Sequence, residues 1–319
     1  MVGRREVSYR GRTVVGMTEV TLAATEPFSF DLSLRALAGF APCAGGHVID
    51  GGRVRKAFLL GSEAVVADVG PAVDDEPGVT LTLHADRHLL PSERAVVHRA
   101  VARWLGLDDD LSAFLEVAER DPAMATLLRA AHGLHQVRFA SLAEGAVYFA
   151  LIQRSTQWYA AARKRRIAAE LGPSLSVDGV AHLAFPSLAT VAAQDDRDLI
   201  RYAGNQLRAR RLREVVEGVA TLDEEWLRTA PYEEVRKALL AVPGVGRFTA
   251  HALLLRVLGR PDRAPLEMAQ FDDAARAVYG DPPPSPAELR AAYGPSIGWW
   301  AYYVRTARSW QPEDTLVAA

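Results

Sequence analysis

The feature that most constrains this fold is a Pro-Gly-Val-Gly turn between two apolar stretches, within residues 239–255. Both stretches have the apolar spacing of helices, so the chain must turn sharply between them. Glycine tolerates positive φ and carries no Cβ, so we expect Gly244 and Gly246 to let backbone amides of the second helix approach a phosphate, aided by the helix dipole. Such contacts are independent of base sequence. The alternative is a purely structural turn between helices, which also uses glycine.

The sequence pattern changes near residue 110. Before it, four β-branched or alternating runs are separated by turns rich in Gly, Pro and Asp, at residues 19–24, 57–61, 64–69 and 79–83. Residues 91–106 place apolar side chains on one face and predict a helix that closes this lobe. From residue 111 onward helix-forming residues dominate between Gly and Pro breaks. We therefore expect an α+β chain that is mostly helical, with a β-rich lobe at 1–110 and an all-helical region at 111–319.

Composition excludes several classes of protein. The 319 residues are 49% hydrophobic, too apolar for disorder and enough for two or three lobes. No run approaches the roughly 18–20 apolar residues of a membrane span, and residues 1–6 lack a signal-peptide pattern, so we expect a cytoplasmic protein. A single cysteine, Cys43, excludes an internal disulfide and a four-cysteine iron-sulfur cluster. The histidines lack metal-ligand spacing, so we expect no catalytic metal.

The hairpin and three further regions resemble the 3-methyladenine DNA glycosylase II family of the helix-hairpin-helix superfamily. The similarity covers residues 110–315 and is weaker in the β-rich lobe. Its segments are 133–153, 185–199 with 204–211, 242–250, and 299–313. The resemblance implies a helix-hairpin-helix glycosylase fold. It also implies a monofunctional DNA glycosylase of base excision repair that removes a damaged base, expected to be alkylated, from duplex DNA.

The resemblance also implies residues that contact DNA. Gly244, Gly246, Arg247 and Thr249 are expected contacts within the hairpin. Gln153 and Arg154 end an apolar helix where similar proteins present a residue that wedges into the base stack left by the extruded base. The competing interpretation of Arg154 is a solvated charge near the basic run at 163–166. That run and residues 208–213 are further candidates for phosphate contacts.

Base excision needs a carboxylate that stabilises a cationic sugar and assists water, and the resemblance places it just after the second hairpin helix. Glu267 falls near the expected distance, whereas Asp272, followed four residues later by Arg276, or Asp273 is the alternative. A glutamate is longer than the family's aspartate by one methylene, which shifts the carboxylate by about an ångström. Glu267 could also serve only the helix dipole. A damage-binding protein with impaired catalysis is therefore the alternative function.

An electron-deficient alkylated purine binds well against aromatic faces. Phe248, Trp299 and Tyr303 are the expected walls of the base pocket, with core packing as the alternative. Arg305 stands where the family often has a pocket tryptophan and would alter base preference. Phe248 replaces the hairpin lysine of members that cleave the backbone, so no Schiff base should form. We expect a monomer that acts on DNA at the nucleoid without a cofactor, and leave open a structural cation at the hairpin carbonyls. The lesion stays open among methylated adenine, deaminated purine and a bulkier adduct.

Overall fold

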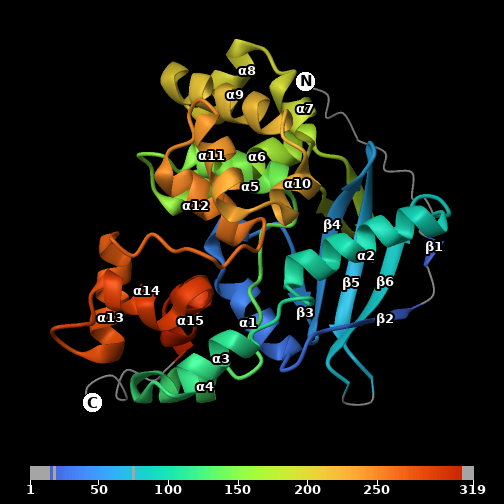
Figure 1. Cartoon of the computed structure of the whole chain (residues 1–319). Coiled ribbons are helices and arrows are strands. Elements are labelled where there is room, and N and C mark those ends of the chain that lie inside the picture. Colours follow the sequence, from blue (N-terminus) through green and yellow to red (C-terminus); the bar gives the residue numbers. More distant parts are fainter. Residues whose placement is uncertain (1–14, 17–18, 74–75, 311–319) are drawn as a thin grey trace, which may run out of the picture.

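A computed structural model describes residues 15–16, 19–73 and 76–310, and within them a six-stranded antiparallel sheet covers one side of the molecule (Figure 1). The strand order is β1-β6-β5-β4-β3, and β2 also pairs with β6. The strands are β1 (Val15–Gly16), β2 (Val20–Ala23), β3 (Val48–Asp50), β4 (Arg53–Leu60), β5 (Glu63–Pro71) and β6 (Gly78–Ala85). All four predicted strand runs are confirmed by β2, β4, β5 and β6. The predictions for residues 1–6 and 311–313 lie outside the described residues.

Helices form most of the rest of the described chain, in three groups along the sequence. The first group is α1 (Phe30–Gly39), α2 (Pro91–Leu105), α3 (Ser112–Glu119) and α4 (Ala125–Ala130). The second is α5 (Leu142–Leu151), α6 (Gln157–Leu171), α7 (Leu188–Ala192), α8 (Asp196–Ala203), α9 (Gln206–Ala220), α10 (Glu224–Thr229), α11 (Tyr232–Ala241) and α12 (Arg247–Arg256). The third is α13 (Ala269–Tyr279), α14 (Pro286–Tyr293) and α15 (Ile297–Thr306). Short 3₁₀ turns η1 (Ala41–Cys43), η2 (Pro122–Met124), η3 (Gly294–Ser296) and η4 (Ala307–Trp310) join them.

The predicted helix at 91–106 is confirmed as α2, and its ends follow from local chemistry. Pro91 occupies the first helical position, where its missing N–H matters least. The Glu93 carboxylate accepts a hydrogen bond from the Leu90 amide at 2.8 Å, which caps the first turn. Gly106 ends the helix at φ 68°, a left-handed conformation that glycine adopts without a steric penalty.

The prediction that residues 111–319 are all helical is wrong at one place. A small antiparallel hairpin, β7 (Ser174–Val177) and β8 (Val180–Leu183), turns at Asp178 and Gly179, which have φ of 49° and 78°. An Asp-Gly pair with positive φ at both positions is the preferred two-residue hairpin turn. The hairpin packs on the outer face of the sheet through a small cluster of apolar residues, Ala57, Ala64, Val66, Leu175, Val177 and Ala184.

Two larger cores organise the rest of the chain. One combines the inner face of the sheet and α1–α4 with the C-terminal helices α13–α15. The other lies within α5–α12. The C-terminal helices therefore share their core with the N-terminal lobe rather than with the hairpin helices, and Figure 1 shows α13–α15 beside α3 and α4. The boundary near residue 110 stays a prediction.

A buried ion network ties the sheet to the central helices. Glu144 on α5 is 2% exposed and hydrogen-bonds Lys164 of α6, while Nζ of Lys56 on β4 lies 3.6 Å from its Oε2. The Ala140 amide also donates to this carboxylate, at 3.2 Å. Burial alone would raise the pKa of Glu144, but the two ammonium groups and these hydrogen bonds hold it at about 2. The carboxylate is therefore ionised in the interior and is compensated by two partners from different elements.

Candidate nucleic-acid interface and base pocket

The helix-hairpin-helix is formed by α11 and α12, as predicted. Gly244 has φ 81°, so the turn needs glycine there. The expectation of positive φ at Gly246 is wrong: its φ is −90° and its ψ 177°, an extended conformation open to any residue. No side chain of the described residues caps α12, and no atom lies within 4 Å of a Cβ added at Gly246. The first amides of α12 therefore have no side-chain cap among the described residues, and the uncapped start of a helix can bind an anion.

Two residues predicted to contact DNA instead support this turn. The Gln153 amide donates to the Gly244 carbonyl at 2.8 Å and lies 3.5 Å from the Thr249 hydroxyl. Thr249 is 2% exposed, so its side chain is not available to DNA. Gln153 therefore links the end of α5 to the hairpin. Gly246 and Arg247 are exposed, and their DNA contacts stay a prediction.

Arg154 follows Gln153 with an exposed side chain and φ 51°, which is unusual for a residue other than glycine. Its carbonyl accepts a hydrogen bond from the Arg208 guanidinium at 3.0 Å, so a second basic residue lies beside it. The strained backbone projects Arg154 from the turn between α5 and α6, next to the hairpin that Gln153 supports. This placement is compatible with the predicted wedge.

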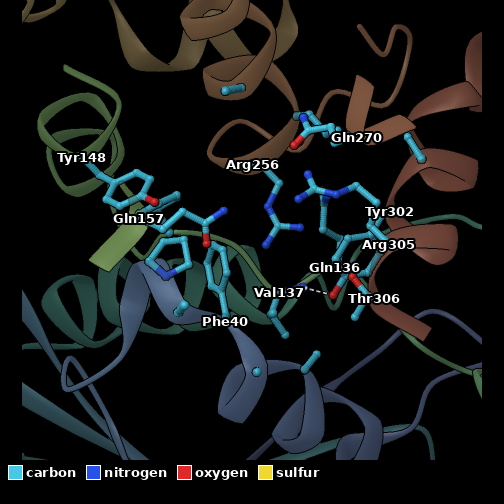
Figure 2. A pocket seen from close by; sticks show the side chains of 18 of the residues that line it. Phe40, Gln136, Val137, Tyr148, Gln157, Arg256, Gln270, Tyr302, Arg305 and Thr306 are labelled. Atoms are coloured by element: carbon cyan, nitrogen blue, oxygen red, sulfur yellow. Dashed lines mark hydrogen bonds between the residues drawn. The ribbon is translucent and has the colours of Figure 1, made fainter. Parts of the chain in front are cut away.

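A cavity of about 280 Å³ lies where α1, α5, α12, α13 and α15 meet (Figure 2). Its volume is at the lower end of small-molecule pockets, about 300–1,000 Å³. Aromatic rings form much of its wall: Phe40, Phe139, Tyr148, Phe149, Phe248, Phe271, Tyr302 and Trp310. Flat apolar surfaces of this kind can stack a planar ring system.

The polar lining of the cavity is rich in hydrogen-bond donors. Arg256, from the last turn of α12, and Arg305 of α15 both line it, and Figure 2 shows the Arg256 guanidinium directed into the open space. Gln136 lines it with a fully buried side chain whose Oε1 and Nε2 have no hydrogen-bond partner among the described residues. The other polar residues of the lining include Arg35, Gln157, His251, Gln270 and Thr306, and burial lowers the pKa of His251. The lining residues within the described chain include no aspartate or glutamate.

Some of the predicted pocket residues face the cavity and others face the core, depending on their position around the helix axis. Phe248 and Arg305 line the cavity, and their role in binding a base stays a prediction. Trp299 and Tyr303 do not: they are 4% and 0% exposed, and the Tyr303 hydroxyl donates to the Leu134 carbonyl at 2.9 Å. These two lie four residues apart and so share the face of α15 that packs into the core. Tyr302, one position earlier than Tyr303, is the tyrosine that faces the cavity.

The predicted catalytic carboxylates lie outside the cavity lining. Asp272 is exposed and pairs with Arg276 at 2.9 Å, four residues later on α13. The Glu267 side chain is 67% exposed and pairs with Arg290. Glu267 nevertheless belongs to the short segment between two lining residues, Pro265 and Gln270, and a backbone hydrogen bond and Arg290 lower its pKa, so it is ionised at neutral pH. Asp273 is also exposed.

Sequence reasoning missed most of the cavity lining, including Gln136, Arg256 and Tyr302. Arg256 had a visible signal, because it interrupts the apolar run at 252–258, and a charge within such a run needs a special environment. Gln136 had no such signal in the sequence, since the burial of its side chain depends on neighbours far away in the chain. Within the described residues, no group of three His, Cys, Asp or Glu side chains is placed to hold a metal ion. No described helix combines the length and apolarity needed to cross a bilayer.

Curated relatives with similar sequences are DNA repair proteins, although no family model matches the chain. A DNA-3-methyladenine glycosylase of Bacillus subtilis (strain 168) is 23% identical over 227 residues, 69% of this chain and 73% of the relative. A probable bifunctional transcriptional activator/DNA repair enzyme AlkA of Mycobacterium tuberculosis (strain ATCC 25618 / H37Rv) is 26% identical over 313 residues. That match covers 94% of this chain but 60% of the relative's length.

Solved structures confirm the fold. The 3-methyladenine DNA-glycosylase of Archaeoglobus fulgidus superposes with a TM-score of 0.74 at 18% identity and covers 93% of this chain and 100% of that one. The Clostridium acetobutylicum 8-oxoguanine glycosylase/lyase, in complex with double-stranded DNA containing cytosine opposite 8-oxoG, gives a TM-score of 0.66 at 17% identity. It covers 92% of this chain and 98% of its own. The expected α+β helix-hairpin-helix fold is therefore confirmed.

Proposed function

We propose that this chain, as a member of the 3-methyladenine DNA glycosylase II family of helix-hairpin-helix DNA glycosylases, hydrolyses the N-glycosidic bond of a damaged base flipped out of duplex DNA. One observation carries the proposal: the uncapped amides and the cavity share helix α12. Gly246 precedes the helix, and Phe248, two residues later, lines the cavity. A phosphate held at the helix start therefore brings the neighbouring nucleotide within reach of the cavity.

Each step of base excision has a candidate residue. The amides after Gly246 hold the DNA backbone without reading sequence. Arg154 fills the space that the flipped nucleotide leaves in the stack. The aromatic walls, including Phe248 and Tyr302, stack the base.

Glu267 is the proposed catalytic carboxylate, with Asp272 as the alternative. Glu267 is ionised, and its neighbours along the chain on both sides reach the cavity lining. For it to act, its side chain has to leave Arg290 and turn toward the deoxyribose of the bound nucleotide, where its charge stabilises the cationic sugar and assists water. Asp272 lies on the exposed side of α13 and would need a larger movement of the helix.

The proposed reaction is hydrolysis without backbone cleavage. Phe248 occupies the hairpin position of the lysine that forms a Schiff base in the lyase members, so this chain offers no amine there. We propose duplex DNA as the partner and the cytoplasm, at the nucleoid, as the location. A structural cation at the hairpin carbonyls also stays a proposal, and the Gly244 carbonyl already accepts a hydrogen bond from Gln153.

The test is base release from duplexes that each carry one damaged purine, followed by alkali, which breaks the strand at abasic sites. The full chain, Glu267→Gln and Asp272→Asn are compared under single-turnover conditions. Asp198→Asn is the matched control, because Asp198 is an exposed helical carboxylate that pairs with Arg201 on α8.

We expect strand breaks with the wild-type chain and the control, and a loss of at least a hundred-fold with Glu267→Gln alone. A loss confined to Asp272→Asn would identify the other carboxylate. Tight binding of damaged duplex without breaks from the wild-type chain would overturn the enzymatic proposal in favour of a damage-binding protein.

A further inference from the structure

The cavity has an unusual charge for a pocket that would receive an alkylated purine cation. Among the described residues, neither Arg256 nor Arg305 has a carboxylate partner, and no acidic side chain lines the cavity. Arg256 instead stacks on rings, with its Cζ 4.3 Å from the Phe40 centroid and 5.0 Å from the Tyr302 centroid. Both guanidinium groups stay protonated at neutral pH. The cavity therefore presents positive charge with no acidic side chain in its lining to balance it.

Burial strengthens this electrostatic preference. Burial lowers the pKa of Arg256, and the nearby Arg305 lowers it further, so the two like charges influence each other across the cavity. Like charges interact strongly where water is partly excluded, and a further positive charge on a bound base would add to the repulsion. An occupant that brings acceptor oxygens would instead stabilise both arginines.

Gln136 supplies a second, independent observation. Its amide is 0% exposed, and both its oxygen and its nitrogen lack a partner among the described residues. A buried amide left without hydrogen bonds is destabilising, because it has lost its water partners and gained none. Its unpaired donor and acceptor match an occupant that offers an adjacent acceptor and donor. A purine with an oxygen at position 6 has this edge, a carbonyl oxygen beside a ring N–H.

We infer that the cavity selects a neutral 6-oxopurine, such as the hypoxanthine formed when adenine loses its amino group, and disfavours cationic alkylated purines. Arg305 and Arg256 donate to the oxygen and N7 edge, as arginine does at guanine in the major groove. Gln136 pairs with the oxygen and N–H edge, and Phe40 and Tyr302 lie around the ring. The inference rests on the proposed function, because it names the substrate class of the same site.

Selection against normal guanine, which shares the 6-oxygen, would come from the duplex. Extruding a base costs least where its pairing is weak, and hypoxanthine opposite thymine is a mismatch. The cavity can therefore contact the base only after the base has been extruded from the duplex.

The test compares base release from three duplexes under single-turnover conditions. The three damaged bases differ in charge and in the oxygen at position 6. Hypoxanthine is neutral and has this oxygen, 7-methylguanine is a cation and has it, and 1,N6-ethenoadenine is neutral and lacks it. We expect release of hypoxanthine to exceed that of the other two by at least ten-fold. In Arg305→Gln, hypoxanthine release should fall about ten- to hundred-fold while release of 7-methylguanine rises or stays constant. Arg129→Gln is the matched control, since Arg129 is an exposed helical arginine outside the cavity.

Gln136→Met separates recognition from structure, because the two roles change stability in opposite directions. Replacing a buried amide that lacks hydrogen-bond partners with an apolar side chain of similar length should keep or raise the melting temperature of the protein. Hypoxanthine release should nevertheless fall at least ten-fold. A fall of both melting temperature and release would assign Gln136 a merely structural role and contradict the inference.

Free bases test the cavity independently of catalysis. We expect free hypoxanthine to raise the melting temperature of the full chain more than free adenine does, and Arg305→Gln to remove that difference. If no base is released from any duplex but the free-base preference is found, the proposed enzymatic function fails while the preference of the cavity for a 6-oxopurine stands. If 7-methylguanine is released fastest and Arg305→Gln slows it, the inference is overturned and the glycosylase function stands.

Discussion

Replacing Glu144 with glutamine should destabilise the protein by about 3–5 kcal/mol at pH 7, because it leaves the charges of Lys56 and Lys164 uncompensated in the interior. The magnitude can also be derived from the pKa. A carboxyl whose pKa falls from 4.5 to about 2 on folding contributes roughly 3 kcal/mol, at about 1.4 kcal/mol per unit. The two routes agree because both measure how strongly the folded protein favours the ionised carboxylate.

The sign of the pH dependence follows from the lowered pKa. The contribution is fully present above pH 4.5, the unfolded value, and is lost as the pH falls toward about 2. The difference in unfolding free energy between wild type and Glu144→Gln should therefore narrow by about 2 kcal/mol between pH 5 and pH 3. Denaturant titrations at several pH values measure it.

The matched control is Glu116→Gln on α3. Its carboxylate is 65% exposed and pairs with Arg120 at 2.7 Å in an i,i+4 arrangement, so its loss should change stability by no more than about 0.5 kcal/mol. The reasoning would be refuted if the unfolding free energies of wild type and Glu144→Gln differed by less than about 1 kcal/mol at pH 7. It would also be refuted if that difference stayed constant from pH 5 to pH 3.

The hairpin and the turn beside it give four further predictions. Gly244→Ala should lower the free energy of unfolding by about 1–2 kcal/mol, since the φ of Gly244 is 81° and an added Cβ would lie 3.0 Å from Val215 Cγ2. Gly246→Ala should leave the free energy of unfolding in denaturant nearly unchanged. The same variant should weaken duplex binding measured by fluorescence anisotropy, because its methyl group would hinder access of a phosphate to the first amides of α12. Gln153→Ala should reduce duplex affinity several-fold by releasing the Gly244 carbonyl, and an unchanged affinity would show that the turn holds without this hydrogen bond. Arg154→Asn keeps a residue that tolerates positive φ but removes the guanidinium, so the fluorescence rise of 2-aminopurine beside a lesion should diminish; an unaltered signal would favour a solvated charge over a wedge.

Local patterns in the sequence determined the elements and the turn between α11 and α12. The four strand runs, the helix at 91–106 and the hairpin at 239–255 all have short-range signals, either apolar periodicity or glycine and proline at fixed places. The Asp178-Gly179 hairpin has such a signal too. The helix-forming sequence on both sides of it nevertheless favours the all-helical prediction, which is wrong there. The family resemblance likewise depended on ordered local segments.

The cavity was decided by tertiary structure alone. Its lining comes from residues as distant in the chain as Phe40, Gln136, Arg256 and Tyr302, and no local pattern says that these meet. Helix phase made the difference at α15, where a shift of one residue, about 100° around the axis, moves a tyrosine from the core to the cavity. Charge inside the cavity depends on which arginines lack a carboxylate nearby, and that is a property of packed neighbours rather than of sequence order.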